Sequence, residues 1–294
     1  MTFGQLNTFM ALARSGSVRG AAAALVVTEP AVSAAVGALQ RDLGVDLVTR
    51  QGRGIVLTPA GETLARYAAE LLGLRDQALR EIRQVRALRL AAVTTAGEYV
   101  VPPLLKAFRG ERPDVQITLE VGNRATVFER LARREADLAI GGQPPAGAGI
   151  SGTPLLDYRL VVVAAADHQV GDPADETWLL REVGSGTRAT VERFLADNGI
   201  APRSTMTLGS NGAIKQAVAV GLGITLLSNH AAGPELASGL LRRVQMQGAP
   251  LRRTWFVLQR DGGAELPEAA AFRAFCRSRA ARAAVLAAIR PARP

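Results

Sequence analysis

The feature that most constrains this chain of 294 residues is a pair of short helical patterns in residues 17–43, joined by a polar turn. Apolar residues recur there at steps of three and four, which places them on one face of each helix. Thr28 stands where an N-cap is needed, and Pro30 falls in the first turn of the second helix, where its missing N–H is not required. The apolar positions are Val18, Ala21, Ala22 and Leu25, then Val32, Ala35, Val36, Leu39 and Leu43. The pattern predicts a helix-turn-helix.

The flanking segments complete a small domain around this pair. Before it, apolar residues recur at helical spacing from Phe3 to Ala13, which predicts a supporting helix that ends near residues 15–16. After it, Gly44 breaks the helical pattern, and residues 45–57 alternate around RQGRG at residues 50–54. This alternation predicts a two-stranded wing. Residues 1–58 are therefore expected to form a winged helix-turn-helix domain.

Burial of the second helix's apolar face leaves its opposite face free to enter a DNA major groove. Arginines in the wing are placed to contact phosphates beside that groove, which adds affinity without sequence information. A solvated hairpin tip is the alternative interpretation of Arg50 and Arg53. The predicted partner is double-stranded DNA. The candidate DNA-binding residues are Ser17, Arg19, Thr28, Glu29, Pro30, Ser33, Ala34, Gly37, Arg41, Arg50 and Arg53.

Longer motifs connect these residues to a known family. TEPAVS at residues 28–33 and LGVDLVTRQGRGIVLTPAG at residues 43–61 resemble the N-terminal domain of LysR-type transcriptional regulators. TTAGEYVVPPLLKAF at residues 94–108, residues 120–145 and REVGSGTR at residues 181–188 look most like the CbbR-like subgroup, which controls Calvin-cycle operons. The resemblance implies a regulator whose operator binding is modulated by a small anionic metabolite. It further implies control of carbon-fixation or central-metabolism genes, while regulators of sulfur, nitrogen or aromatic metabolism share the same blocks.

The recognition face departs from the family at a few positions. Members usually carry Gln where this chain has Glu29, and often Arg or Gln where it has Ala34 and Ala35. A carboxylate beside phosphates weakens binding, although it can accept a hydrogen bond from the N4 amino group of cytosine. We therefore expect modest base readout, with more reliance on DNA shape and on wing contacts.

Residues 59–87 predict a long helix with a coiled-coil stripe. Thr58 and Pro59 mark its start, and Arg75 is the one polar residue in the a/d pattern. Packing onto the chain's own regulatory domain is the alternative to dimerisation. A symmetric dimer would carry two DNA-reading domains, or readers, and recognise an inverted-repeat operator. The resemblance implies a homotetramer built as a dimer of dimers. RNA polymerase is a further candidate partner. The candidate dimerisation residues are Leu64, Ala68, Leu71, Ala78, Ile82 and Val85.

From residue 88 onward, strand and helix patterns alternate, which predicts parallel-sheet α/β structure. Two such sets resemble the periplasmic-binding-protein-like effector domain of the family, with one lobe at about 88–160 plus 262–294 and a second at about 161–261. Strands are expected at 88–95, 115–121, 137–141, 158–164, 178–181, 205–208, 224–227 and 253–258, followed by one terminal helix. Small ligands in such folds bind at strand ends between the lobes.

Polar, glycine-containing turns follow the predicted strands, and one of them precedes a helix. Free N–H groups at that helix start, hydroxyls and an arginine make a plausible anion cradle. The alternative is that GSGT is only a helix cap and that Arg188 is a solvated charge. We predict a carboxylate or phosphate effector. The candidate effector-binding residues are Thr94, Thr95, Asn123, Arg124, Gly141, Gly142, Gly184, Ser185, Gly186, Thr187 and Arg188.

Other classes of protein have little support. His168 and His230 are expected to be surface residues, and no cluster with metal-ligand spacing or nucleophile motif occurs, so we expect no enzyme, metal or cofactor. A transferase using the GSGT turn and a solute-binding protein with a fused segment are the alternatives. The single Cys276 is expected to pack beside Phe272 and Phe275. The net charge of +9 favours a polyanionic partner, and the absence of a signal peptide or long apolar run predicts a cytoplasmic protein without membrane contact.

Overall fold

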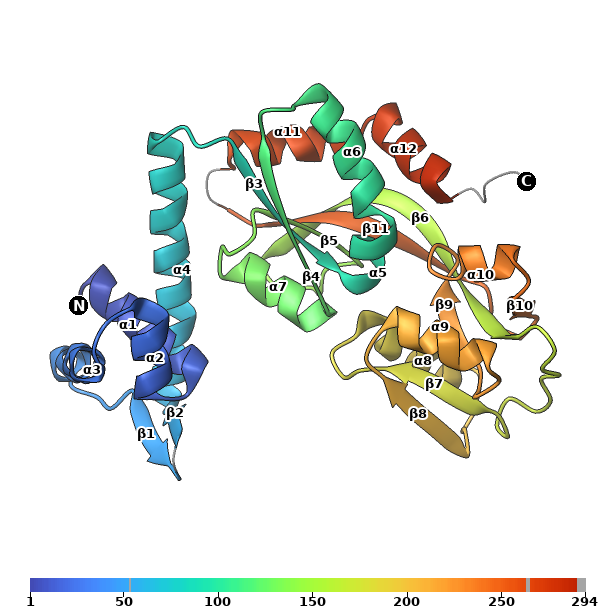
Figure 1. The fold of residues 1–294 in the computed structure, drawn as a ribbon, viewed down its shortest axis with the longest axis horizontal. Coiled ribbons are helices and arrows are strands. Elements are labelled where there is room, and N and C mark those ends of the chain that lie inside the picture. Colours follow the sequence, from blue (N-terminus) through green and yellow to red (C-terminus); the bar gives the residue numbers. More distant parts are fainter. Residues whose placement is uncertain (53, 263–264, 290–294) are drawn as a thin grey trace. The chain divides into compact units, whose positions relative to one another are not determined.

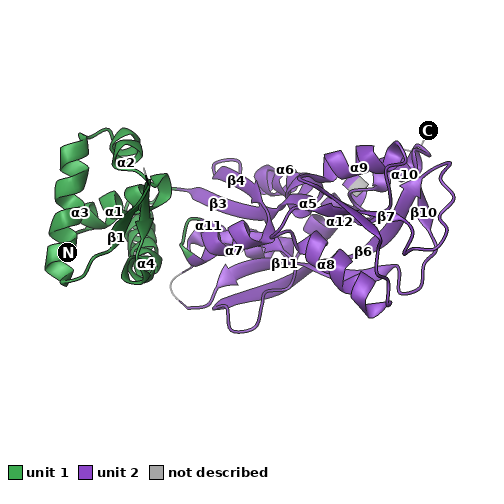
Figure 2. Cartoon of the chain, turned by 90° about the horizontal axis from the view of Figure 1, so that it is seen from below, with its two compact units in different colours: residues 1–85, 133–135 green, residues 86–132, 136–294 purple. Residues whose placement is uncertain are grey.

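The computed structural model describes residues 1–52, 54–262 and 265–289. The chain divides into two compact units, residues 1–85 with 133–135 and residues 86–132 with 136–294 (Figure 2). Arg53, one of the predicted DNA-contacting residues, lies outside the described residues. Among those that are described, no single helix is long and apolar enough to cross a membrane; α2 and α3 satisfy the length and composition only as a pair bent by 106°.

Unit 1 begins with three helices whose starts are capped by side chains. Thr2 accepts a hydrogen bond from the backbone N–H of Gln5, whose side chain accepts one from Thr2 in return. Thr28 caps the third helix and Pro30 lies in its first turn, as the sequence predicts. The helices are α1 (Phe3–Ser15), α2 (Val18–Leu25) and α3 (Glu29–Leu43).

The buried faces of these helices confirm the helix-turn-helix. Val32 and Val36 pack in one cluster with Leu12 of α1 and with α2, and Leu39 packs in the next cluster with α1 and α4. Val32 and Leu39 have no exposed surface. Leu43 was expected on this buried face, but as the last residue of α3 it is 39% exposed.

The predicted wing is present as β1 (Val48–Gln51) and β2 (Gly54–Leu57), an antiparallel pair. Two contacts hold it against the helices. The backbone N–H of Ile55 donates to the carbonyl of Gly16 at 2.8 Å, and the Gln40 side chain accepts from the N–H groups of Leu47 and Val48 at 2.8 and 3.2 Å. The wing is therefore tied by hydrogen bonds to α3 and to the end of α1.

Helix α4 (Pro59–Ile82) belongs to unit 1, which differs from the prediction of a separate linker over residues 59–87. Its alanines at 65, 68 and 69 are buried against Leu6 and Phe9 of α1. Such small side chains let two helices approach closely, so the first half of α4 completes the core of the DNA-reading unit.

Unit 2 has a sheet in the order β10-β6-β11-β5-β3-β4, with β9 paired to β6, and a separate parallel pair of β7 and β8 (Figure 1). β3 is parallel to β4 and β5, and the other pairs of the large sheet are antiparallel. Its elements are β3 (Ala87–Val93), α5 (Thr94–Tyr99), α6 (Val101–Glu111), β4 (Gln116–Gly122), α7 (Arg124–Ala132), β5 (Leu138–Gly141), β6 (Ile150–Ala165), β7 (Thr177–Arg181), α8 (Gly186–Asp197), β8 (Ser204–Leu208), α9 (Asn211–Ala219), β9 (Thr225–Ser228), α10 (Gly233–Ala237), β10 (Leu241–Val244), β11 (Leu251–Arg260), α11 (Pro267–Cys276) and α12 (Arg279–Ile289).

The two predicted lobes are present, each with its own core. In lobe I, β3, β4 and β5 are covered on one face by α6, α11 and α12, where Phe108, Phe272 and Phe275 meet, and on the other face by α7. Cys276 is buried in this first cluster, as predicted. In lobe II, α8 covers one face of the sheet around Trp178, and α9 and α10 cover the other.

The lobe boundary differs from the predicted one because β6 and β11 run through both lobes. They pair antiparallel from Leu251 with Leu160 to Arg260 with Ile150. Trp255 therefore packs in lobe I and Leu251 against the core of lobe II, so the second crossing lies near residues 252–254 instead of 261.

Three predicted elements also differ from the observed ones in their bounds or number. β6 begins well before residue 158 because pairing with β11 sustains it past Pro154, which disguised the strand in the sequence. Residues 94–95 begin α5 instead of ending a strand. The single terminal helix is two helices, with Ser278 between them accepting from the N–H of Ala281.

Candidate functional site

Most of the predicted DNA-contacting residues lie on the surface of unit 1. Ser17 and Gly37 are half-buried, while the other described candidates are exposed: Arg19, Thr28, Glu29, Pro30, Ser33, Ala34, Arg41 and Arg50. A Cβ added at Gly37 would lie 3.5 Å from a guanidinium nitrogen of Arg41, so the Arg41 side chain lies back along the helix. This surface presents α3 with a cation near its C-terminal end and Glu29 at its N-terminal end.

The predicted dimerisation residues separate into two groups. Leu71, Ala78, Ile82 and Val85 are exposed, and Leu64 is half-buried. Ala68 has no exposed surface and packs in the core of unit 1, so its assignment as an interface residue was wrong. The exposed apolar side chains of α4 form what we call its outward stripe. Besides Leu71 and Ile82, it includes Tyr67, 55% exposed, and Leu74, 49% exposed.

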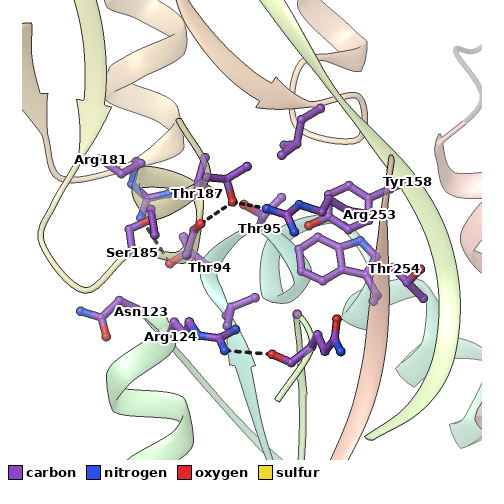
Figure 3. A pocket seen from close by; sticks show the side chains of 18 of the residues that line it. Thr94, Thr95, Asn123, Arg124, Tyr158, Arg181, Ser185, Thr187, Arg253 and Thr254 are labelled. Carbon is purple, nitrogen blue, oxygen red and sulfur yellow. Dashed lines mark hydrogen bonds between the residues drawn. The ribbon is translucent and has the colours of Figure 1, made fainter. Parts of the chain in front are cut away.

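A cavity of about 450 Å³ lies between the lobes of unit 2 (Figure 3). Lobe I contributes Thr94 and Thr95 from the start of α5, Asn123 and Arg124 just after β4, and Gly142 after β5. These are the carboxyl ends of three neighbouring strands, as the sequence predicts for a ligand site in an α/β fold.

Lobe II closes the cavity with the start of α8. Ser185 caps this helix by accepting from the N–H of Arg188 at 3.4 Å. The N–H groups of Gly186 and Thr187 in its first turn have no acceptor within the part of the chain that the structure describes. Ser185, Gly186 and Thr187 all line the cavity, so the helix start offers hydroxyl and N–H donors to an anion.

The charge of the lining is entirely positive. Five arginines, Arg124, Arg181, Arg193, Arg252 and Arg253, line the cavity among its described residues, and no aspartate or glutamate does. Among these five arginines and the described part of the chain, Arg181 alone has an adjacent carboxylate, that of Glu182, which it meets at 2.7 and 2.9 Å. A ligand with negative charge would therefore find several cations that the protein leaves uncompensated.

Arg124 is held on lobe I by a carbonyl and an aromatic ring. Its guanidinium donates to the carbonyl of Gln143 at 2.8 Å and lies over the ring of Phe128 at 4.6 Å. Burial, and then the positive charge of Arg253, lower the pKa of Arg124. Both causes disfavour its charged form, so an anion bound between Arg124 and Arg253 would relieve this electrostatic strain.

Arg188, which the sequence predicts as an anion ligand, is not among the residues that line the cavity. Its guanidinium donates to Glu192 at 2.8 Å, to the carbonyl of Arg181 at 3.0 Å and to Thr207 at 3.2 Å. The residue lies one turn into α8, where its side chain reaches back over the end of β7. Gly141 and Gly184 are also absent from the lining, since Gly141 is buried within β5.

The comparisons with known proteins cover both units of the chain. Residues 3–62 match the description "Bacterial regulatory helix-turn-helix protein, lysR family", and residues 83–281 match "LysR substrate binding domain". The chain belongs to the LysR family of transcriptional regulators. Its winged helix-turn-helix is the DNA-binding domain of such a regulator, and its two-lobed unit is the effector-binding domain.

Several relatives of this LysR-type regulator are named for carbon fixation. The RuBisCO operon transcriptional regulator of Acidithiobacillus ferrooxidans is 38% identical over 92% of each chain. The regulator CbbR of Rhodospirillum rubrum is 36% identical over 94% of this chain and 96% of the relative. The CbbR-like resemblance of the sequence is thus confirmed.

Two solved structures are similar to parts or all of the chain. The CcmR regulatory domain of Synechocystis PCC6803, solved in complex with 2-PG, is 33% identical, covers 66% of this chain and 98% of that domain, and has a TM-score of 0.61. CbnR, 22% identical with a TM-score of 0.67, covers 96% of this chain and 99% of its own length. CbnR supports the fold alone.

The cavity of this LysR-type regulator also has an aromatic wall that its sequence did not predict. Tyr158 of β6 and Trp255 of β11 stack with their ring centroids 4.2 Å apart. Burial raises the pKa of Tyr158 to about 12, although Arg253 lowers it in part. Both residues lie where the strands pass between the lobes, so only the pairing of β6 with β11 could have revealed them.

His230, expected at the surface, is buried behind Tyr158 at a ring distance of 5.9 Å. Burial lowers the pKa of His230 to about 4, so it is neutral at physiological pH. His168 contacts Glu176 at 2.9 Å. Among the described residues, no group of three histidine, cysteine or acidic side chains is placed to hold a metal.

Proposed function

We propose that this LysR-type regulator binds a small anion, carrying carboxylate or phosphate groups, in the cavity between its lobes. The observation that carries the proposal is the cavity lining, which has five arginines and no acidic residue. Compact guanidinium groups and free N–H donors are the usual partners of phosphate and carboxylate. The similar CcmR domain was solved with 2-PG, a ligand of this class.

We further propose that the regulated genes include those of carbon fixation, since two of its relatives are named RuBisCO operon transcriptional regulators. The protein acts in the cytoplasm as a DNA-binding protein and catalyses no reaction. Its DNA contacts are made by the exposed residues of α2, α3 and the wing. When a ligand closes the two lobes, the placement of the paired DNA-binding domains on an inverted-repeat operator changes.

Oligomerisation through α4 is part of the same proposal. Leu71, Leu74 and Ile82 are 40%, 49% and 77% exposed on its surface. Apolar residues repeated at this spacing are stabilised by a partner helix. A dimer of dimers would then carry four readers and bind two adjacent stretches of operator.

A thermal-shift screen against central-metabolism anions, with 2-PG among them, tests effector binding. A ligand at a hundred times its dissociation constant adds about 2.7 kcal/mol of stability. We expect Arg124→Ala to remove the shift, because Arg124 lines the cavity. Arg188→Ala is the matched control and should keep the shift, because its side chain lies outside the lining. An equal loss in both variants, or no shift with any anion, would reject the anion site.

DNase footprinting on the DNA upstream of the host's RuBisCO operon tests the regulatory part. We expect protection of an inverted repeat and a change of the footprint when the effector from the screen is added. A footprint that the bound effector leaves unchanged contradicts the mechanism in which lobe closure resets the readers. Failure to bind this DNA more tightly than an unrelated fragment contradicts the choice of target genes.

A further inference from the structure

The hydroxyl groups around the cavity are not equivalent as donors. Each has a single hydrogen to donate. Thr94 donates its hydrogen to the carbonyl of Gly122 at 3.2 Å, and Thr190 donates to the carbonyl of Gly186 at 2.8 Å. These two hydroxyls line the cavity but are already committed to the protein backbone.

The neighbouring hydroxyl of Thr95 is in the opposite state. It accepts a hydrogen bond from the side-chain Nδ2 of Asn211 at 3.2 Å, and it donates to no other described residue. Thr95 lines the cavity and is 6% exposed. With its oxygen engaged by Asn211, its hydrogen is left for a group inside the cavity.

Asn211, at the first position of α9 in lobe II, has no exposed surface and does not line the cavity. Its Oδ1 accepts from the guanidinium of Arg181 at 2.6 Å, while its Nδ2 also donates to the carboxylate of Glu98 at 3.0 Å. Arginine can only donate and an ionised carboxylate can only accept, so these two partners fix the orientation of the amide. The NH₂ group must therefore face Thr95.

We infer that Asn211 is a positioning residue for the effector: it holds Thr95 of lobe I as a hydrogen-bond donor to the bound anion, whereas Thr94 is structural. The inference rests on the proposed anion site and specifies its hydrogen-bond polarity. The ligand group favoured beside Thr95 is an acceptor, such as an ionised carboxylate or phosphate oxygen, because the hydroxyl hydrogen has no other described partner.

Substitution of Asn211 by Asp reverses this polarity in a nearly isosteric side chain. A carboxylate would accept from Thr95, turning the oxygen lone pairs of Thr95 toward the anion. Aspartate is favourable in the first turn of a helix, but one of its oxygens would face the carboxylate of Glu98, so the thermal midpoint of the variant is compared with that of the parent. Thr95→Val and Thr94→Val remove one hydroxyl each at constant shape.

The experiment is isothermal titration of the full chain and its variants with 2-PG, and in parallel with inorganic phosphate. We expect Thr95→Val to weaken binding at least about tenfold, as for loss of a hydrogen bond to a charged group. Thr94→Val should weaken it by less than about threefold. Asn211→Asp should weaken binding at least about fivefold more in the parent than in a Thr95→Val background.

The possible results separate the inference from the proposal beneath it. If the parent protein binds either probe, but Thr94→Val costs as much as Thr95→Val, or the effects of Asn211→Asp and Thr95→Val are additive, the positioning role is wrong and the anion site stands. If the parent protein binds neither probe, while circular dichroism shows it folded, the anion site for this class fails and the inference fails with it. Unfolded variants are identified by their thermal midpoints without ligand.

Discussion

At the scale of residues, three arginines near the start of α8 have different roles because their partners differ. Arg181 is 3% exposed and is held by Glu182 and Asn211, so it shapes the cavity floor. Arg188 is directed along β7 by carbonyl and hydroxyl acceptors. Arg124 has no carboxylate partner among the described residues, which leaves its charge for a ligand.

His230 gives a prediction at this scale. The pKa of His230 is about 4 in the folded protein and about 6.5 in the unfolded chain. Between these two pH values the unfolded chain is protonated at His230 and the folded protein is not. The folded state therefore loses stability as the pH falls from 6.5 toward 4. Between pH 7 and pH 4.5 we expect His230 to account for a loss of about 2 kcal/mol.

Urea unfolding followed by tryptophan fluorescence measures this effect, because Trp178 and Trp255 both lie in unit 2. His230→Phe should be less sensitive to pH than the parent over this range. His168→Phe is the control, because His168 is paired with Glu176 near the surface. If the pH dependence of His230→Phe equals that of the parent, burial of a neutral imidazole does not explain the acid lability.

At the scale of elements, the junction between α4 and the wing depends on a glycine. A Cβ built on Gly61 would lie 1.9 Å from the carbonyl oxygen of Leu47, just before β1. That same carbonyl accepts from the N–H of Thr58, so it cannot move away without loss of a hydrogen bond. The close approach of α4 to the wing therefore requires glycine at this position.

We expect Gly61→Ala to lower the stability of unit 1 by about 3 kcal/mol, as for overpacking against backbone. Operator affinity should fall as well, because the segment that Gly61→Ala displaces is hydrogen-bonded to α3 through Gln40. Gly110→Ala is the matched control, since nothing lies within 4 Å of its Cβ position. Thermal unfolding and gel-shift assays measure both effects, and a Gly61→Ala protein with parental operator affinity would contradict the coupling.

At the scale of the whole molecule, the outward stripe of α4 predicts how copies of the chain associate. Leu71→Glu with Leu74→Glu places charges on that stripe and should convert the oligomer to smaller species, since buried unpaired carboxylates are costly. Effector binding should persist, because the cavity lies within unit 2. Operator affinity should fall because paired readers are lost.

Sedimentation velocity checks this expectation, with the exposed Thr63→Glu on the same helix as control. An unchanged sedimentation coefficient for the double variant would reject α4 as the interface. A change in the Thr63→Glu control equal to that in the double variant would show that added charge alone drives dissociation.

Interactions between residues close together in the sequence determined the helices and strands of unit 1. They also determined which strand ends line the cavity. The spacing of Val32, Val36 and Leu39, the cap at Thr28 and the glycine at 44 depend on neighbours within a turn or two, so the sequence predicts them. The same holds for Thr95 and Asn123, because the carboxyl ends of parallel strands meet at one edge of a sheet.

The tertiary structure alone decided which polar groups face the ligand. Tyr158, Trp255 and Arg253 reach the cavity only because β6 and β11 pair across both lobes. Arg188 is turned away by acceptors on β7 and β8, and Asn211 reaches Thr95 from a distant helix. Ala68 was assigned to an interface, yet α1 buries it within its own unit. The periodicity of one segment predicts which face of a helix or strand is apolar. Only long-range contacts determine which residues cover that face and which group accepts each hydrogen bond.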